Sequence, residues 1–102
     1  MRYRFGKGAN ADVRAALRYY ESRSADVPAR FLSAVTGAAR DVSQHPERYP
    51  REEASGNLRE FRRFVLDDFP FSLIYEVKID ELIILAVAHH RRHPGYWRRR
   101  KG

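Results

Sequence analysis

Cysteine is absent from this chain of 102 residues, and so is any long apolar run. Without cysteine there are no disulfides, no thiolate nucleophile and none of the usual zinc ligand sets, which fits a reducing cytosol. Residues 1–20 hold no apolar core of signal-peptide length, and nowhere do about 18 apolar residues follow one another, the length that a membrane span needs. We therefore expect a cytoplasmic protein with no membrane partner.

Other absences narrow the possible functions. The chain has no glycine-rich loop of the kind that cradles phosphates, no Ser/His/Asp arrangement at a recognisable spacing and no paired-carboxylate signature. Together these absences disfavour nucleotide-binding, esterase and glycosidase functions.

Acidic residues are missing from the C-terminal part. From Leu82 onward there are six Lys and Arg residues and no Asp or Glu, whereas Met1–Glu81 holds 14 basic against 13 acidic residues. Nearly all of the net charge of +7 therefore lies near the C-terminus. A patch of one sign attracts polyanions in a salt-dependent way, so nucleic acid or an acidic protein is the expected partner.

The hydrophobic content of 43% is enough for one core, so residues 1–102 are expected to form a single domain. Residues 2–5 alternate as in a short strand. Asn10 can cap a first helix with a stripe of Val13, Ala16, Leu17 and Tyr20, and Ser24 or Asp26 can cap a second one. The second helix has Pro28 in its first turn and an apolar stripe of Phe31, Ala34, Val35, Ala38 and Val42, and it ends before Pro46. The two helices should form an antiparallel hairpin.

Three strands are expected after the helices, at residues 57–66, 71–79 and 81–89. In the first strand the apolar residues do not occupy alternate positions, which indicates a bulge or a change of register. The second alternates cleanly, and the third is apolar at both parities, as in a central strand. The order predicts an α+β fold: an N-terminal strand, a two-helix hairpin and three antiparallel strands in one sheet. The helices would cover one face, and solvent and a partner would share the other.

The candidate site residues lie on the arginine-rich strand and in the basic C-terminal part. Arg91 and Arg92, together with Arg59, Arg62 and Arg63, could surround a phosphate with fork-shaped donors, or could form a solvated face that receives acidic side chains. His89, His90 and His93 could supply a base. Because no cysteine or carboxylate completes a ligand set, no metal and no other cofactor is expected.

The aromatic pair Tyr96 and Trp97 could stack on unpaired bases or pack against the core. We expect Tyr96 to bind and Trp97 to pack. Beyond them, a basic tail at residues 98–102 is expected, mobile in its Arg98–Lys101 stretch.

The stretches "ADVRAALRYYE", "FPFSLIYEV" and "IILAVAHHRRHPGYW", in this order over most of the chain, resemble the RelE/ParE superfamily of toxins from type II toxin–antitoxin systems. The resemblance implies a helical hairpin on a largely antiparallel sheet. It also implies a hetero-oligomer with a cognate antitoxin whose acidic or amphipathic segment wraps the toxin.

The superfamily uses two mechanisms, and the resemblance leaves both open. RelE-like members cleave mRNA on the ribosome without a metal, and here that would use Arg62 or Arg63, Arg91 or Arg92, Tyr96, and His90 or His89 as base. Ser72 stands where many relatives have an arginine, which removes one expected phosphate ligand. ParE-like members poison DNA gyrase and need no nuclease centre. The cluster of His, Arg and Tyr favours the ribonuclease, whereas Ser72 counts against it; of the two mechanisms we expect mRNA cleavage, with gyrase poisoning as the alternative. A third possibility is a degenerate module that only binds its antitoxin and regulates the operon, so whether the chain is an enzyme stays open.

Overall fold

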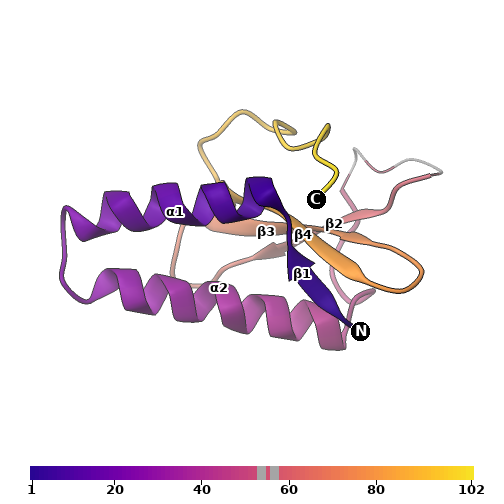
Figure 1. Cartoon of the computed structure of the whole chain (residues 1–102), viewed down its shortest axis with the longest axis horizontal. Helices are drawn as coiled ribbons and strands as arrows, with labels where there is room; N and C mark the ends of the chain where they lie inside the picture. The colour runs from indigo at the N-terminus through magenta and orange to yellow at the C-terminus, as the bar shows by residue number, and fades with distance from the viewer. Residues whose placement is uncertain (53–54, 56–57) are drawn as a thin grey trace.

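The computed structural model describes residues 1–52, 55 and 58–102. Its elements are β1 (Tyr3–Phe5), α1 (Lys7–Glu21), α2 (Val27–Gln44), β2 (Phe61–Val65), β3 (Phe71–Val77) and β4 (Leu82–His89) (Figure 1). The helices run antiparallel, side by side, and the α+β class is confirmed. Among the described residues, no helix is long and apolar enough to cross a membrane.

The four strands form one mixed sheet in the order β1-β4-β3-β2. Strands β2, β3 and β4 are antiparallel neighbours, as expected, but β1 pairs in parallel with β4. The helical hairpin carries the chain from the β1 edge to the β2 edge, and β4 then returns beside β1 in the same direction. The sheet therefore consists of the three expected antiparallel strands and of β1, an edge strand that pairs in parallel with β4.

Both helices differ at their starts from the simplest capping prediction. α1 begins at Lys7, with Gly6 as N-cap, and the Asn10 N–H donates to the Gly6 carbonyl at 3.0 Å, so Asn10 lies inside the helix and does not cap it. Asp26 is the N-cap of α2, but its carboxylate accepts from the Ser24 hydroxyl at 2.8 Å and not from the helix backbone. Pro28 lies in the first turn, as predicted.

The predicted bulge lies in a different strand pair. β2 pairs regularly with β3, and Leu58, which is 98% exposed, lies outside the strand. The irregularity is between β3 and β4, where Ile74 pairs with Ala86 but Tyr75 pairs with Ile84. The extra residue, Leu85, and its neighbour Ala86 both join the same apolar cluster.

Apolar side chains fill both faces of the sheet. On the helix face, the stripe of α2 packs with Leu73, Tyr75 and Ile84. On the other face, a second cluster contains Phe61, Ile74, Ile83, Leu85, Ala86, Ala88 and Trp97. That face was expected to be shared between solvent and a partner, but residues 90–102, which we call the C-terminal segment, fold back over it (Figure 1).

Candidate functional site

Strand β1 covers only the first part of the β4 edge, and the rest of this edge has no neighbouring strand in the described structure. The pairing ends at Phe5 and Ile84, where the Gly6 N–H still donates to the Ile84 carbonyl at 2.9 Å. Two side chains complete the edge: Asp12 Oδ2 accepts from the Val87 N–H at 3.0 Å, and Arg100 Nη1 donates to the Leu85 carbonyl at 2.9 Å. Since buried backbone groups need partners, this ion pair takes the place of the missing strand.

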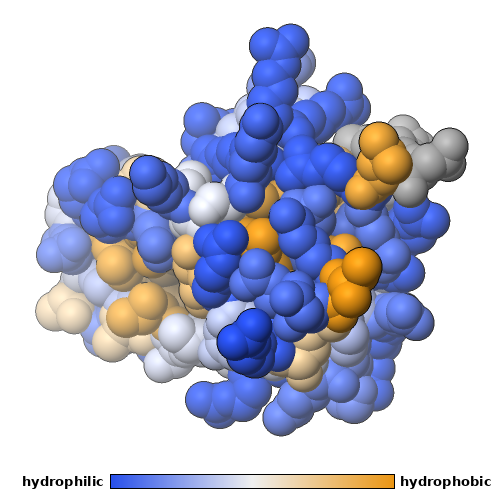
Figure 2. Space-filling view, turned by 45° about the vertical axis from the view of Figure 1, so that its right-hand side comes forward, coloured by the Kyte–Doolittle hydropathy of each residue, from blue (hydrophilic) through white to orange (hydrophobic). Residues whose placement is uncertain are grey.

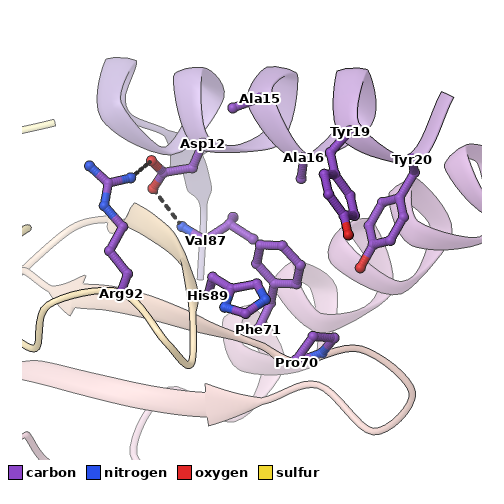
Figure 3. A pocket seen from close by; sticks show the side chains of 10 residues that line it. All are labelled: Asp12, Ala15, Ala16, Tyr19, Tyr20, Pro70, Phe71, Val87, His89 and Arg92. Atoms are coloured by element: carbon purple, nitrogen blue, oxygen red, sulfur yellow. Dashed lines mark hydrogen bonds and ion pairs between the residues drawn. The ribbon is translucent and has the colours of Figure 1, made fainter. Parts of the chain in front are cut away.

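Asp12 of α1 is the centre of this arrangement. Its residue is 8% exposed, and its carboxylate accepts from Arg100 at 2.8 and 3.2 Å and from the Tyr96 hydroxyl at 3.0 Å. Arg92 Nη1 lies 3.6 Å from Asp12 Oδ1, and Figure 3 shows Arg92 and Val87 directed at the carboxylate. A buried carboxylate requires such compensation by hydrogen bonds and cations. We call Asp12, Arg92, Tyr96 and Arg100 the Asp12 cluster.

The Tyr96 ring contacts two guanidinium groups of this cluster. The Arg92 guanidinium carbon is 3.8 Å from the ring centroid, and that of Arg100 is 4.9 Å from it. Burial, the negative charge of Asp12 and the hydrogen bond to it raise the pKa of Tyr96 to about 12. The ring is thus a neutral, partly buried contact of Arg92 and Asp12.

The raised pKa of Tyr96 predicts a loss of stability in alkali. The folded value is about 12 and the ordinary value is 10.0, so above pH 10.0 the unfolded chain loses this proton before the folded chain does. The free energy of unfolding should therefore fall as pH rises toward 12, by at most about 1.4 kcal/mol per pH unit for one phenol. Tyr75, whose pKa burial raises to about 12, adds a similar contribution. Tyr96→Phe should make the fall shallower in urea unfolding between about pH 9 and pH 11, and a slope equal to that of the unaltered chain would contradict the assignment.

Arg59 fastens the backbone of the C-terminal segment. It forms two hydrogen bonds of 2.8 Å with Glu76, which is 4% exposed, and donates to the carbonyls of Arg98 at 3.1 Å and Arg100 at 2.7 Å. The hydrogen bond to Glu76 raises the pKa of Arg59. The Arg98–Lys101 stretch, which was expected to be mobile, has two backbone hydrogen bonds to Arg59 and a third hydrogen bond from Arg100 to Asp12. Arg59 itself binds a carboxylate and backbone carbonyls in place of the expected phosphate.

Arg62 and Arg63 point to opposite faces of β2. Arg62 donates to Glu60 at 2.6 Å and to the Tyr49 carbonyl at 2.6 Å, on the helix face. Arg63 donates to Glu52 at 2.6 Å. Neighbouring residues of a strand alternate between faces, so only one of the two could enter a given site.

The two histidines at the end of β4 also point to opposite sides of the sheet. His89 packs edge-on against Phe71, with ring centroids 4.9 Å apart. His90 is exposed, and its Nε2 lies 2.9 Å from the hydroxyl of Ser72, which is itself fully buried. Arg91 is exposed, and its backbone N–H donates to His89 Nδ1 at 3.0 Å. No group of three potential metal ligands occurs in the described part of the chain.

A cavity of about 450 Å³ lies between α1 and the ends of β3 and β4 (Figure 3). Its lining is mainly apolar, with Asp12 and Arg92 toward one end and Tyr19 and Tyr20 toward the other. The lining consists of Asp12, Ala15, Ala16, Tyr19, Tyr20, Pro70, Phe71, Val87, His89 and Arg92. Of the six principal candidates from the sequence, Arg62, Arg63, His90, Arg91, Arg92 and Tyr96, only Arg92 lines it.

The candidates therefore do not converge. Arg92 and Tyr96 meet at Asp12, His90 and Arg91 lie at the exposed end of β4, and Arg62 and Arg63 lie on β2 with their own carboxylates, beyond β3. Asp12 was missed, although it carries a signal: it lies on the apolar side of α1, in line with Ala16 and Tyr20 at helical spacing. A buried carboxylate needs a cation to compensate its charge, and the C-terminal segment supplies Arg92 and Arg100.

Comparisons with known proteins agree with this fold. The family model described as ParE toxin of type II toxin-antitoxin system, parDE, matches residues 3–94. A solved structure titled the chromosomal ParDE TA system from P. aeruginosa is 26% identical, with a TM-score of 0.63, and the match covers 87% of this chain and 95% of that chain. No curated protein matches. The resemblance to the RelE/ParE superfamily is confirmed, and the chain belongs to the family of ParE toxins of type II toxin–antitoxin systems.

Proposed function

We propose that this toxin inhibits growth by poisoning DNA gyrase and not by cleaving mRNA on the ribosome. The family assignment supports a ParE-like mechanism. The observation that carries the proposal is that the expected nuclease groups are dispersed and engaged: Tyr96 donates to Asp12, and Arg62 and Arg63 each contact a carboxylate at 2.6 Å. A phosphate-cleaving centre needs a base and cationic groups aimed at one scissile bond.

Its cognate antitoxin is the partner that a type II system implies. We propose that the two form a hetero-oligomer through an acidic or amphipathic antitoxin segment. The net charge of +7 supports an acidic one, since a basic chain attracts an acidic segment from a distance, wherever on the surface that segment then binds.

The ribonuclease alternative has one observation in its favour. His90 is exposed beside Arg91, and its ring contacts Ser72 at 2.9 Å. A ribonuclease of this chain would therefore have His90 as its base, which makes this residue the discriminating one.

The test is inducible expression of the chain, with gyrase activity and mRNA ends measured in parallel. We expect growth arrest, trapped gyrase–DNA complexes and loss of supercoiling with purified gyrase, while transcripts stay intact. His90→Ala should keep the full effect, whereas loss of a general base would lower a cleavage rate by about 10²–10⁴-fold.

Two results would contradict the proposal. Codon-positioned mRNA cuts that disappear in His90→Ala would establish the ribonuclease. Normal growth and unaffected gyrase, with an antitoxin that still co-purifies, would indicate the degenerate binding module.

A further inference from the structure

We propose that the outer surface of the C-terminal segment binds the phosphate backbone of duplex DNA. The binding groups are Arg91, Arg98, Arg99 and Lys101, which are spread along the segment from the His89 end of β4 to the β3–β4 turn, and which we call the cationic face. Binding by this face does not depend on gyrase, so the inference goes beyond the proposed function.

The six cations of the segment divide into two sets. Arg92 and Arg100 are directed at Asp12, at 3.6 and 2.8 Å. The four cations of the cationic face are exposed, and none of them forms a salt bridge within the described residues. Asp12 thus pairs with the inner set only, and the outer four charges are left for a partner.

The outer set stands on an anchored backbone. Trp97 is 2% exposed and holds the middle of the segment in the second apolar cluster. Arg59 binds the carbonyls of Arg98 and Arg100, and Arg4 binds that of Gly102 at 3.1 Å. Figure 2 shows hydrophilic side chains standing out at the top of the molecule, where the C-terminal segment lies in Figure 1. Because the backbone is already ordered, binding costs little additional entropy there.

The neighbouring aromatic residues decide between kinds of polyanion. Proteins grip single strands by stacking bases on exposed aromatic rings, but Trp97 is buried and the Tyr96 ring contacts Arg92. An acidic protein partner would need an apolar centre to its interface. The exposed residues of the C-terminal segment offer only Pro94 as an apolar side chain, and the exposed Leu58 and Ile79 share a hollow with Lys101 but with none of the three arginines. Arginines without stacking rings or apolar anchors suit the backbone of a duplex, without readout of its sequence.

Such binding has a measurable salt dependence. Each phosphate neutralised contributes about −0.9 to the slope of log K against log salt concentration, so four cations predict a slope of about −3 to −4. We would measure it by fluorescence anisotropy of a labelled mixed-sequence duplex, with the purified full-length chain and increasing salt.

The triple variant Arg98→Gln/Arg99→Gln/Lys101→Gln removes side chains that anchor nothing in the described structure, while Trp97, Arg100 and the Arg59 contacts stay. We expect its slope to be smaller in magnitude by about 3 and its affinity at low salt to fall by about tenfold or more. The matched control is Arg30→Gln/Arg40→Gln/Arg48→Gln, which removes the same charge from α2 and the turn after it. This control should bind as the unaltered chain does, and circular dichroism should show that both variants are folded.

Three outcomes would overturn the inference. An equal loss in both variants would show that only net charge matters. Tighter binding of a single strand than of the duplex would indicate base stacking. Competition by a polyglutamate peptide as strong as that by unlabelled duplex would assign the cationic face to an acidic protein. Since the assay contains no gyrase, failure here leaves the gyrase proposal standing, and a gyrase-negative result leaves DNA binding standing.

Discussion

Replacing Asp12 with alanine is expected to lower the free energy of unfolding by about 3–5 kcal/mol, the usual cost of removing one partner from a buried ion pair. The loss leaves the Val87 N–H without its acceptor and the Arg100 guanidinium, whose side chain is 23% exposed, without its counter-charge. Urea unfolding followed by far-ultraviolet circular dichroism would measure it, with an unchanged m-value as the sign that the denatured state is unaltered.

Two further substitutions make this measurement specific. Asp12→Asn keeps an oxygen acceptor but not the charge, so it should be destabilised less than the alanine variant. Asp26→Asn removes a carboxylate that lies 3.6 Å from Arg30 in an exposed pair, and no measurable loss is expected. If Asp12→Ala cost no more than Asp26→Asn, the Asp12 cluster would not be what fastens the C-terminal segment.

The elements of the fold that could be predicted from the sequence are those set by local periodicity. The stripes of α1 and α2 and the alternation in β3 place each side chain relative to its near neighbours, and these predictions agree with the structure. The parallel pairing of β1 with β4 and the shift at Ile74 and Tyr75 depend on contacts between distant parts of the chain. No local pattern carries that information, which is why both were missed.

In the site, too, the contacts that were missed join distant parts of the chain. The contact of Asp12 with Arg100 spans 88 positions, and the contact of Trp97 with Phe61 joins the end of the chain to β2. The grouping of both Arg62 and Arg63 around one phosphate, by contrast, could have been reduced in advance to one of the two. Successive strand residues face opposite sides, so that pair could never have lined one site together.

The basic composition of the C-terminal segment therefore has two physical roles in one stretch. Arg92 and Arg100 stabilise a buried carboxylate, and Arg100 also helps to complete the edge of β4, while their neighbours stay in solvent. A count of charges cannot separate these roles, because it does not show which arginines have a buried partner. The position of Asp12 shows which arginines stabilise the fold, because these are the ones whose guanidinium groups reach its carboxylate.

Replacing Trp97 with alanine should have an effect as large as that of Asp12→Ala, about 3–5 kcal/mol of unfolding free energy, because a large side chain leaves a packed cluster. The indole is 2% exposed and packs edge-on against Phe61, with ring centroids 5.1 Å apart. Trp97→Phe keeps an aromatic ring in this place, so its free energy of unfolding should fall by less than that of Trp97→Ala. Tyr19→Ala removes an aromatic side chain that is 54% exposed. It is the surface control, and its free energy of unfolding should fall least.

The Trp97 variant also tests whether the sheet holds the C-terminal segment in place. Trp97 is followed directly by the bonds after Arg98 and Arg99, at which trypsin can cut once the backbone is released. With the indole gone, we expect trypsin to cut there earlier than elsewhere in the chain, as mass spectrometry would show, and the salt slope for duplex DNA to become smaller. Equal cutting rates in Trp97→Ala and the unaltered chain would mean that the Asp12 and Arg59 contacts hold the segment without the indole. In that event Asp12→Ala and Trp97→Ala would lower the free energy of unfolding independently of each other. The double variant Asp12→Ala/Trp97→Ala should then show the sum of the two decreases.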